Sequence, residues 1–318
     1  SQNRHRMSVL AEIAKKTFRN PKWYSVAMRI YLLTLLLFAL LVFTSLSFCV
    51  SLAGATEKSL KIIPEQIIQG GPFLAVIEEI KDISAVKKIT FDGETVGVFS
   101  YQNKPTALVG VDLKKKAGNY DLVVQFSDGQ SIKKVVNVGA REKVETPLGI
   151  PEKLGGNTKE SQNKLVATLA EENKSLANLR TGKKAFWMEK FAYPLSQIVV
   201  TDVYGYSRKT GEYSIAHKGV DFRAKEGTPV MAINRGIVRV AKSYRNYGKV
   251  VVIDHGLGLM TFYLHLSKIK VNEGELVKLG QAIGLSGQTG YVLSPHLHLS
   301  VRINNNSIDP IKFFELFK

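Results

Sequence analysis

The chain has 318 residues but only one cysteine, Cys49, only six histidines, and no His-Glu-x-x-His sequence. A single cysteine excludes a disulfide framework and a structural zinc site built on thiolates, because both need several cysteines. The missing His-Glu-x-x-His pattern excludes the metallopeptidase type in which that glutamate is the general base. Any metal site would therefore use histidine and carboxylate ligands.

Four of the scarce metal-binding side chains fall in two short patterns. His217 and Asp221 stand in His-Lys-Gly-Val-Asp, and His296 and His298 stand in Ser-Pro-His-Leu-His. Residues two apart on a strand point to the same face, so His296 and His298 can aim into one pocket. On a straight strand His217 and Asp221 would be roughly 13 Å apart, which is too far for one metal. Gly219 between them permits a bend, and we expect a turn leading into a strand, because glycine and valine disfavour a helix interior.

A fifth candidate, His265, lies between the two patterns in Phe-Tyr-Leu-His-Leu. Three nitrogen and carboxylate ligands would leave a fourth position for water, which is the pattern of a catalytic zinc rather than a structural one. Zinc lowers the pKa of bound water to about 7, and a nearby imidazole can take its proton, stabilise the oxyanion or protonate a leaving amine. These residues therefore indicate hydrolysis by a metal-activated water.

In these motifs the chain resembles the lysostaphin/LytM-type zinc endopeptidases, which cut peptide bonds in peptidoglycan. Five matching pieces stand in the family's order within residues 187–311, less than half of the chain. They are His217-Lys-Gly-Val-Asp221-Phe, Gly227-Thr-Pro-Val, Tyr263-Leu-His265-Leu, Gly287-Gln-Thr-Gly290 and Pro295-His296-Leu-His298. The combined pattern is highly specific, although His-x-His alone would be weak.

The resemblance also implies a role for each site residue. His217, Asp221 and His298 would hold the zinc, while His265 and His296 would be catalytic residues beside the metal-bound water without being ligands. Leu-Ser-Val after the last histidine, and a Tyr-Val-Leu-Ser turn before the pattern, depart from residues frequent in the family and leave substrate preference open. All five positions are present, which favours an active enzyme over a catalytically silent scaffold that binds and activates another cell-wall hydrolase.

The remaining histidines and several isolated acids are expected to be ordinary residues. His255 stands in a glycine turn, Asp-His-Gly-Leu-Gly, and is expected to be structural. His5 lies in a basic tail and is expected to be solvated. Asp202, Asp254 and Asp309 are expected at strand ends or turns.

The N-terminal part has the pattern of a membrane anchor. A basic tail, residues 1–29, precedes an apolar stretch, residues 30–53, that suits one transmembrane helix of about 20 residues. Positive residues stay on the cytoplasmic side, so we expect a cytoplasmic tail and a single-pass protein of the inner (cytoplasmic) membrane, with its catalytic domain periplasmic or extracytoplasmic. A cleaved signal sequence is the alternative, because Ala53-Gly-Ala55 fits a cleavage site, but the apolar and basic regions are long for a signal. A lipoprotein motif at Cys49 is disfavoured by Phe48, which stands where a small residue is expected.

Residues 60–142 contain short apolar runs that recur at strand spacing, with Asp92-Gly and Asp128-Gly as turns. The pattern predicts a small β-sandwich, immunoglobulin-like. Residues 143–185 read as a Pro- and Gly-rich linker over 143–158, then a helical arm over 159–180 with leucines on one side. The pattern lasts only about three heptads, so a packing or docking arm is favoured over a long coiled coil.

Residues 186–318 show short strands and many glycines, most clearly over 230–240, 249–254, 260–266 and 297–303. We expect an antiparallel β catalytic domain with a groove across one face and the metal at its floor. The fold class is therefore mainly β, with the sandwich, the helical arm and an N-terminal transmembrane helix preceding the catalytic domain.

The net charge of +17 points to anionic partners. No nucleic-acid motif is present, and the expected export argues against nucleic acid. Basic residues before the anchor would meet anionic lipid head groups, while those outside could hold an anionic wall polymer. The charge is compatible with peptidoglycan, whose stem peptides carry carboxylates.

The sequence thus predicts a zinc-dependent endopeptidase that hydrolyses peptide cross-links of bacterial peptidoglycan. By resemblance we expect the bond between D-Ala and diaminopimelate to be cut, with glycine bridges as the alternative. An envelope or division protein is a candidate partner. Residues 60–185 carry no site of their own and are expected to act as a spacer, a partner surface or a cover over the zinc cleft.

Overall fold

The computed structural model describes residues 2–17, 28–29, 32–37, 58–177, 179–187 and 190–318. The chain divides into two compact units, residues 1–57 and 58–318. In the first unit, helix α1 (Gln2–Thr17) occupies much of the predicted basic tail, and residues 32–37 are helical. Most of the predicted anchor, 30–53, lies outside the described residues, as do the alternative cleavage sites. Within the described part of the chain, no helix is long and apolar enough to cross a membrane.

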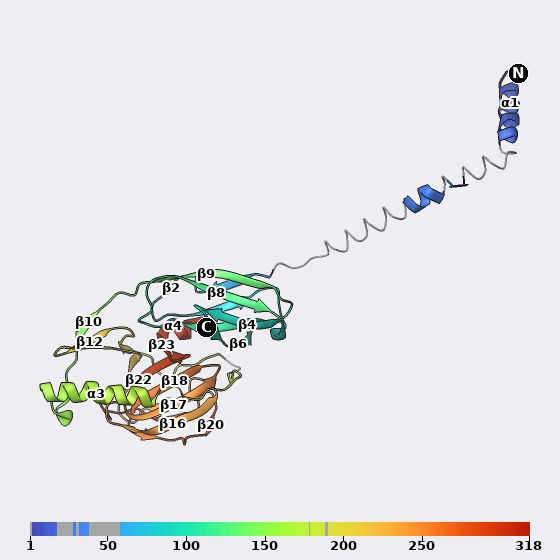
Figure 1. Cartoon of the computed structure of the whole chain (residues 1–318). Helices are drawn as coiled ribbons and strands as arrows, with labels where there is room; N and C mark the ends of the chain where they lie inside the picture. The colour runs from blue at the N-terminus through green and yellow to red at the C-terminus, as the bar shows by residue number, and fades with distance from the viewer. Residues whose placement is uncertain (1, 18–27, 30–31, 38–57, 178, 188–189) are drawn as a thin grey trace. The chain divides into compact units, whose positions relative to one another are not determined.

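The second unit begins with two β-sheets that face each other across an apolar core, and this confirms the prediction of a strand-rich segment (Figure 1). One sheet has the order β1-β3-β7-β6, with strands Leu60–Ile63, Pro72–Ile77, Lys104–Gly110 and Val98–Tyr101. The other has the order β2-β9-β8-β4-β5, with strands Ile67–Ile68, Ser131–Gly139, Gly118–Phe126, Val86–Phe91 and Glu94–Val96. A 3-10 turn, η1 (Ile83–Ala85), precedes β4. The immunoglobulin-like topology stays a prediction.

The two central strands of the sheet β1-β3-β7-β6, which are β3 and β7, are buried on both of their faces. Along β3, Phe73, Ala75 and Ile77 point into the core of the sandwich. The alternate residues Leu74 and Val76 point the other way, into a second core that they share with the C-terminal domain. A strand that is buried on both faces reads as a continuous apolar run, which is what Pro-Phe-Leu-Ala-Val-Ile shows. The sandwich and the C-terminal domain are therefore fused through a common core.

Aromatic packing and polar contacts complete this junction. The rings of Phe99 and Trp187 meet edge to face with centroids 5.1 Å apart. The guanidinium of Arg141 pairs with Asp309 at 3.1 Å, and Asp309 also caps helix α4 (Pro310–Leu316) by accepting from its first backbone N–H groups. Asp309, expected to be an ordinary turn residue, thus holds two parts of the unit together.

The segment predicted as a linker and helical arm is folded onto the C-terminal domain. Strand β10 (Glu145–Pro147) pairs in parallel with β12 (Ser207–Thr210), and β12 pairs with β13 (Tyr213–Ala216). A 3-10 turn, η2 (Glu152–Leu154), and helix α3 (Lys159–Ser175) follow. The helix begins at Lys159, as expected, and its cap residue is Thr158, but it ends at Ser175, five residues before the predicted Arg180. The carbonyl of Leu176, the residue after the helix, accepts from the side chain of Arg302 at 3.0 Å.

The C-terminal domain confirms the predicted antiparallel sheet. Its main sheet has eight strands in the order β11-β14-β22-β18-β17-β16-β20, with β23 paired to β22. The strands are Val200–Asp202, Val220–Arg223, His296–Ile303, Leu259–Leu266, Gly248–Gly256, Gly236–Tyr244, Leu276–Val277 and Asn306–Ile308. A small sheet β15-β21-β19 adds Pro229–Met231, Ala282–Leu285 and Lys268–Ile269. The neighbouring strands β14, β22 and β18 carry four of the five candidate site residues.

Candidate metal centre

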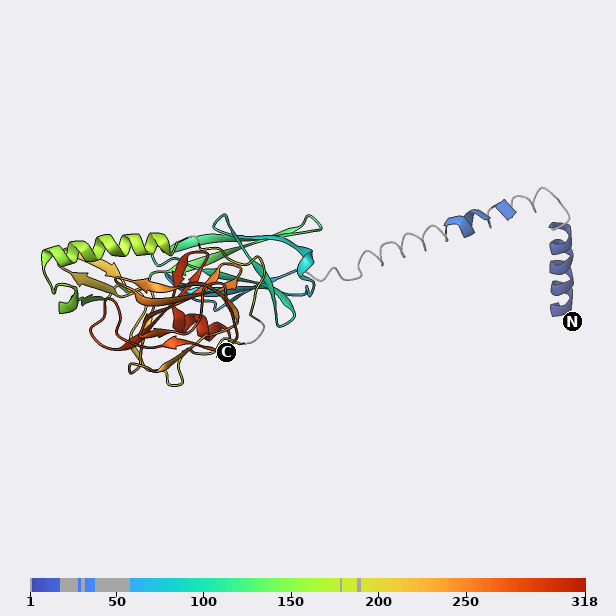
Figure 2. The same ribbon diagram turned by 90° about the horizontal axis from the view of Figure 1, so that it is seen from below.

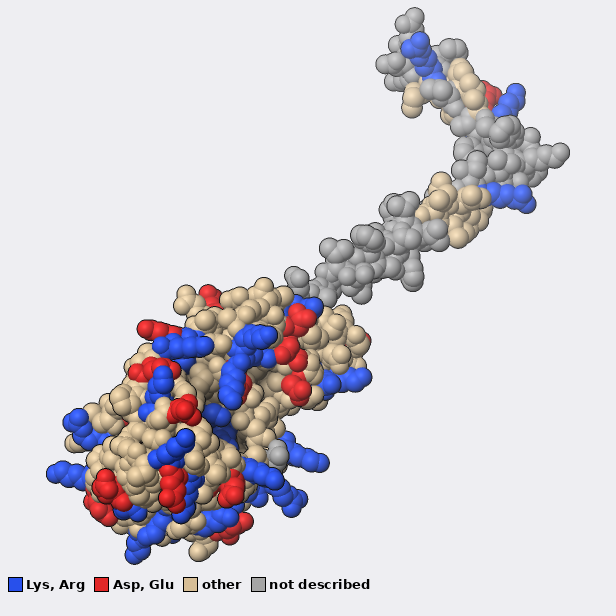
Figure 3. All heavy atoms as spheres, turned by 60° about the vertical axis from the view of Figure 1, so that its left-hand side comes forward, with Lys and Arg blue, Asp and Glu red and all other residues tan. Residues whose placement is uncertain are grey.

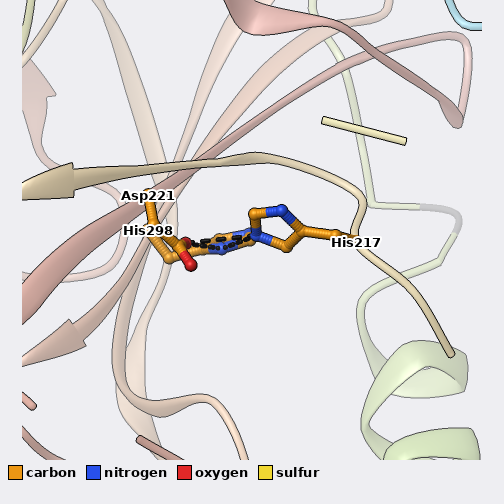
Figure 4. Close-up of side chains that lie close together, drawn as sticks. All are labelled: His217, Asp221 and His298. Atoms are coloured by element: carbon orange, nitrogen blue, oxygen red, sulfur yellow. Dashed lines mark hydrogen bonds and ion pairs between the residues drawn. The ribbon is translucent and has the colours of Figure 1, made fainter. Parts of the chain in front are cut away.

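Three of the predicted site residues converge on one point. Asp221 on β14 lies directly opposite His298 on β22, and His217 stands on the segment that leads from β13 into β14. The Oδ1 atom of Asp221 lies 2.7 Å from Nδ1 of His298 and 3.1 Å from Nε2 of His217, and these two nitrogens are 3.1 Å apart (Figure 4). All three side chains are buried. Within the part of the chain that the structure describes, this is the one group of His, Cys, Asp or Glu with metal-ligand geometry.

Gly219 provides the bend that the sequence requires. Glycine is needed at this position mainly because a side chain would not fit. The backbone bends at this position and enters β14 at Val220, as expected. A Cβ atom on Gly219 would lie 2.4 Å from Nε2 of His298 and 2.5 Å from the carbonyl oxygen of Leu299. Only glycine therefore allows the loop carrying His217 to approach the strand carrying His298.

Hydrogen bonds on the outer side of each imidazole fix which nitrogen faces the centre. Nδ1 of His217 lies 2.8 Å from the carbonyl oxygen of Val203, an acceptor, so the ring carries its hydrogen there. Nε2 of His298 lies 2.9 Å from Oγ of Ser300, and that hydroxyl donates to the carbonyl of Lys218 at 2.7 Å. Since the hydroxyl hydrogen is used, Oγ accepts from the imidazole. The inward nitrogens of both neutral rings are therefore unprotonated.

Two nitrogen lone pairs and a carboxylate oxygen thus meet with no hydrogen between them. Such a group is stable only around a cation, either an added proton or a metal ion. Burial lowers the pKa of His298 to about 4, so a proton is disfavoured there at neutral pH. Burial opposes ionisation of Asp221, but its contacts with His217 and His298 outweigh this and hold the pKa of its carboxyl well below the usual range. A set of two imidazoles and one carboxylate fits zinc, with room for a water as fourth ligand.

The second oxygen of Asp221 is held by an arginine that the sequence patterns did not single out. Nη2 of Arg208, on β12, lies 2.7 Å from Oδ2 of Asp221 and also pairs with Asp202. The guanidinium therefore fixes the carboxylate so that Oδ1 alone points to the centre. Asp202, expected to be an ordinary strand-end residue, is part of this arrangement. No spacing rule links position 208 to 221, because the contact depends on how the β12–β13 hairpin folds back.

His265 and His296 lie beside the centre without joining the converging atoms. Their ring centroids are 5.0 Å apart, and Nε2 of His296 is 3.7 Å from Oδ1 of Asp221. Strand β18 carries an extra residue opposite β17 just before its end, and His265 there has a φ of +63°, in the left-handed region. A bulge of this kind re-aims a side chain, and strain of this kind is concentrated at functional sites. Burial, with the neighbouring rings of His296 and His298, holds the pKa of His265 well below its usual range.

The remaining histidine with a described environment is structural, as expected. His255 is fully buried, and its ring nitrogens meet the carbonyl of Arg235 at 2.8 Å and the hydroxyl of Thr261 at 2.9 Å. Its neighbour Asp254, also buried, accepts from Arg239 and from the backbone of Gly182. This pair fastens the segment before the peptidase sheet, because Gly182 donates to the Asp254 side chain and Phe186 donates to the His255 carbonyl.

Replacing Ser300 by alanine tests the proton arrangement. The change removes the acceptor that keeps the hydrogen of His298 on Nε2, so zinc affinity is expected to fall roughly 10–100-fold while the fold is kept. Competition with a chromophoric chelator measures this. Ser307→Ala is the matched control, because its hydroxyl donates to the same Lys218 carbonyl at 2.9 Å, whereas Ser300 is the hydroxyl that meets His298. Equal zinc affinity in both variants would contradict the arrangement.

Comparison with known proteins agrees with this geometry. Residues 215–310 match the sequence profile described as Peptidase family M23. Peptidoglycan DD-endopeptidase ShyA of Vibrio cholerae is 45% identical over 96 residues, which are 30% of this chain and 22% of that protein. Glycyl-glycine endopeptidase ALE-1 of Staphylococcus capitis is 41% identical over 106 residues, which are 31% of this chain and 29% of that protein. A solved peptidase M23 structure from Pseudomonas aeruginosa is 25% identical, covers 79% of this chain and 96% of its own, and has a TM-score of 0.53.

The chain therefore contains a metallo-endopeptidase domain. The domain belongs to peptidase family M23, the LytM/lysostaphin family. This chain spans 22% of the length of ShyA and 29% of that of ALE-1, so the match concerns the peptidase domain and not the whole of either protein.

Proposed function

We propose that this protein is a zinc-dependent endopeptidase that hydrolyses peptide cross-links of bacterial peptidoglycan. The observation that carries the proposal is the convergence of His217, Asp221 and His298, with unprotonated nitrogens and one carboxylate oxygen facing a common point. These three residues would hold the zinc. When bound, the ion would polarise the scissile carbonyl and lower the pKa of a water molecule to about 7.

His265 and His296 are the residues that would move protons. Nδ1 of His265 lies 3.0 Å from the carbonyl of Thr289, and Nδ1 of His296 lies 2.9 Å from the carbonyl of Ser294. Each ring therefore carries its hydrogen on Nδ1 and presents a bare Nε2. A bare Nε2 can take the proton of an attacking water and later give it to the leaving amine. The lowered pKa of His265 keeps that ring neutral and ready to accept a proton at neutral pH.

The surface and the relatives support a peptidoglycan substrate. Lys and Arg side chains are spread over the visible face of the folded unit, with acidic residues between them, and the whole chain has a net charge of +17 (Figure 3). Such a surface attracts a polymer whose peptides carry carboxylates. The relatives' names cover both D,D bonds and glycyl-glycine bonds. We place the bond between D-Ala and diaminopimelate first, and mass spectrometry of the released muropeptides tests this choice.

The proposed location is the outer side of the cytoplasmic membrane, with residues 30–53 as a single anchor and the metallopeptidase domain in the periplasm or extracytoplasmic space. The support is the order of the sequence, in which a basic tail precedes a long apolar stretch. Protease accessibility of the catalytic domain in spheroplasts, compared with that in lysed cells, tests the orientation.

Hydrolysis of purified sacculi by the zinc-loaded protein is the direct test of the function. The expected result is release of muropeptides with newly free amino groups, and loss of this release when zinc is removed with 1,10-phenanthroline. Restoration by added zinc completes the experiment. Stoichiometric zinc without any cleavage of sacculi would favour the scaffold that activates another hydrolase.

A further inference from the structure

Strand β14 carries a second charged side chain on the face that bears the metal centre. Val220 and Phe222, with Ala224 just after the strand, belong to the core that the peptidase sheet shares with the sandwich. Successive side chains of a strand point to opposite faces, so Asp221 and Arg223 both lie on the other face. Arg223 therefore stands on the face of the metal centre, roughly 7 Å along the strand from a predicted ligand.

The register of the sheet places Arg223 next to a candidate catalytic residue. Arg223 of β14 lies opposite His296 of β22, just as Asp221 lies opposite His298. Side chains that lie opposite each other on neighbouring strands have Cβ atoms about 4.5–5.5 Å apart. Nε2 of His296 is in turn 3.7 Å from Oδ1 of Asp221. Arg223 is thus a direct neighbour of His296, which borders the converging ligand atoms.

The charge of Arg223 is not neutralised by any neighbour. The side chain is exposed, and within the described residues its guanidinium makes no ion pair and no hydrogen bond. On the side of β11 its backbone N–H donates to the carbonyl of Val199, an exposed apolar residue, at 2.8 Å. The acid on its own strand, Asp221, is already bonded to Arg208 and to the two ligand histidines. The guanidinium is therefore available to an anion that enters the site.

A second cation follows two residues later. Lys225 comes after the buried Ala224, is exposed, and its ammonium makes no ion pair or hydrogen bond to the part of the chain that the structure describes. The acid that follows it, Glu226, is exposed and pairs with neither cation. The arginine with a structural role behaves differently, since Arg208 is half-buried and bound by two carboxylates. Arg223 and Lys225 thus have the exposure and the free charge of ligand-binding residues.

The opposite side of the metal centre is apolar and covered. Leu264 of β18 lies opposite His298 and belongs to a core that Leu176, just after α3, completes over β16, β17 and β18. Figures 1 and 2 show α3 alongside the peptidase sheet. The β14 side of the centre, with Arg223 and Lys225, is therefore its exposed and cationic side.

We propose that Arg223, assisted by Lys225, determines substrate specificity by binding a free carboxylate of the substrate next to the scissile bond. A guanidinium can bind a carboxylate through two parallel hydrogen bonds, so it orients the substrate as well as attracting it. An extended peptide advances about 3.4 Å per residue, so one or two residues span the step from Asp221 to Arg223. This inference rests on the proposed function and names the feature of the substrate that the site recognises.

The two cross-links considered above differ in this feature. In the cross-link from D-Ala to diaminopimelate, the carbon that bears the cleaved nitrogen also bears a carboxylate. In a glycine bridge, the corresponding carbon bears no charged group. A cation beside the scissile bond therefore favours the first cross-link, and amidation of that carboxylate removes the advantage.

The test compares two soluble cross-linked muropeptides in which the diaminopimelate carboxylate next to the scissile bond is either free or amidated. For the zinc-loaded full-length protein, kcat/KM is expected to be roughly tenfold higher for the free form, because hydrogen bonds to charged groups are the stronger ones. Arg223→Gln is expected to lose this preference by lowering kcat/KM for the free form alone, and Lys225→Gln to lose part of it. Lys278→Gln is the matched control, because Lys278 is an exposed cation just after β20, at the other edge of the main sheet.

The ratio of the two kcat/KM values separates recognition from a structural defect. A wild-type protein without preference, or an Arg223→Gln variant that slows both substrates equally, would overturn the carboxylate site. Zinc content is expected to be unchanged in every variant, which excludes loss of metal as the cause. If no variant hydrolyses either substrate, the endopeptidase proposal fails, and calorimetric binding of the two muropeptides decides about Arg223. Tighter binding of the free form that Arg223→Gln abolishes would uphold the carboxylate site, and equal binding would overturn it.

Discussion

Replacement of Asp221 by alanine is expected to abolish zinc binding and hydrolysis together. The variant loses the one anionic ligand, and it leaves the guanidinium of Arg208, formerly 2.7 Å from Oδ2, facing the metal position. The loss of affinity should exceed the roughly 10–100-fold that follows removal of a ligand's hydrogen-bond partner. Metal analysis after dialysis and release of muropeptides from sacculi are the two measurements.

Asp202→Asn is the control for Asp221→Ala. Asp202 contacts the same arginine but does not reach the centre, so this variant should retain stoichiometric zinc. Complementation of a deletion strain gives the biological test. An Asp221→Ala protein that fully complements would support the scaffold and count against the enzyme.

Replacement of His265 by alanine is expected to separate metal binding from catalysis. His265 contributes none of the converging ligand atoms, so zinc should stay bound. Its bare Nε2 is one of two groups that can transfer protons, and loss of general acid–base catalysis costs typically 10²–10⁴-fold in rate. Zinc content and kcat on a soluble cross-linked muropeptide measure the two effects.

His296→Ala is the parallel variant, because His296 lies beside the same centre on β22. It should also keep zinc and lose rate. Loss of zinc from either variant, at wild-type thermal stability, would show that the residue is a ligand and would contradict the assignment of three ligands.

Local patterns were sufficient to predict that His217, Asp221 and His298 lie close together, and the reason lies partly in β22. His296 and His298 are two apart on one strand, so a single strand places both on the same face whatever the rest of the fold does. His217 and Asp221 needed only one bend at Gly219. The hydrogen-bond partner of each outer ring nitrogen was harder to predict, since Ser300 acquires its role from the loop that brings the carbonyl of Lys218 beside it.

Contacts between segments distant in the sequence could not be predicted. Arg208 reaches Asp221 because the β12–β13 hairpin folds over β14, and nothing in the spacing of 208 and 221 encodes that fold. Residues 143–185 were expected as a linker and a helical arm, because their prolines, glycines and polar helix give no sign of the strand pairing and the contacts that they make. Glu172 is a plain helical glutamate in the sequence, and its burial depends on a turn more than 70 residues away.

Strands β3 and β7, which are buried on both faces, limit where the chain can be truncated without exposing its core. A peptidase fragment beginning at residue 186 would expose Ile303 and Ile308 to solvent, because these residues pack around Gly110 of β7. Trp187 would also lose its ring contact with Phe99. Such a fragment would expose a broad apolar wall and tend to aggregate. In chimeras between relatives, the exchanged fragment should therefore start at residue 58, so that the sandwich and the peptidase domain are exchanged together.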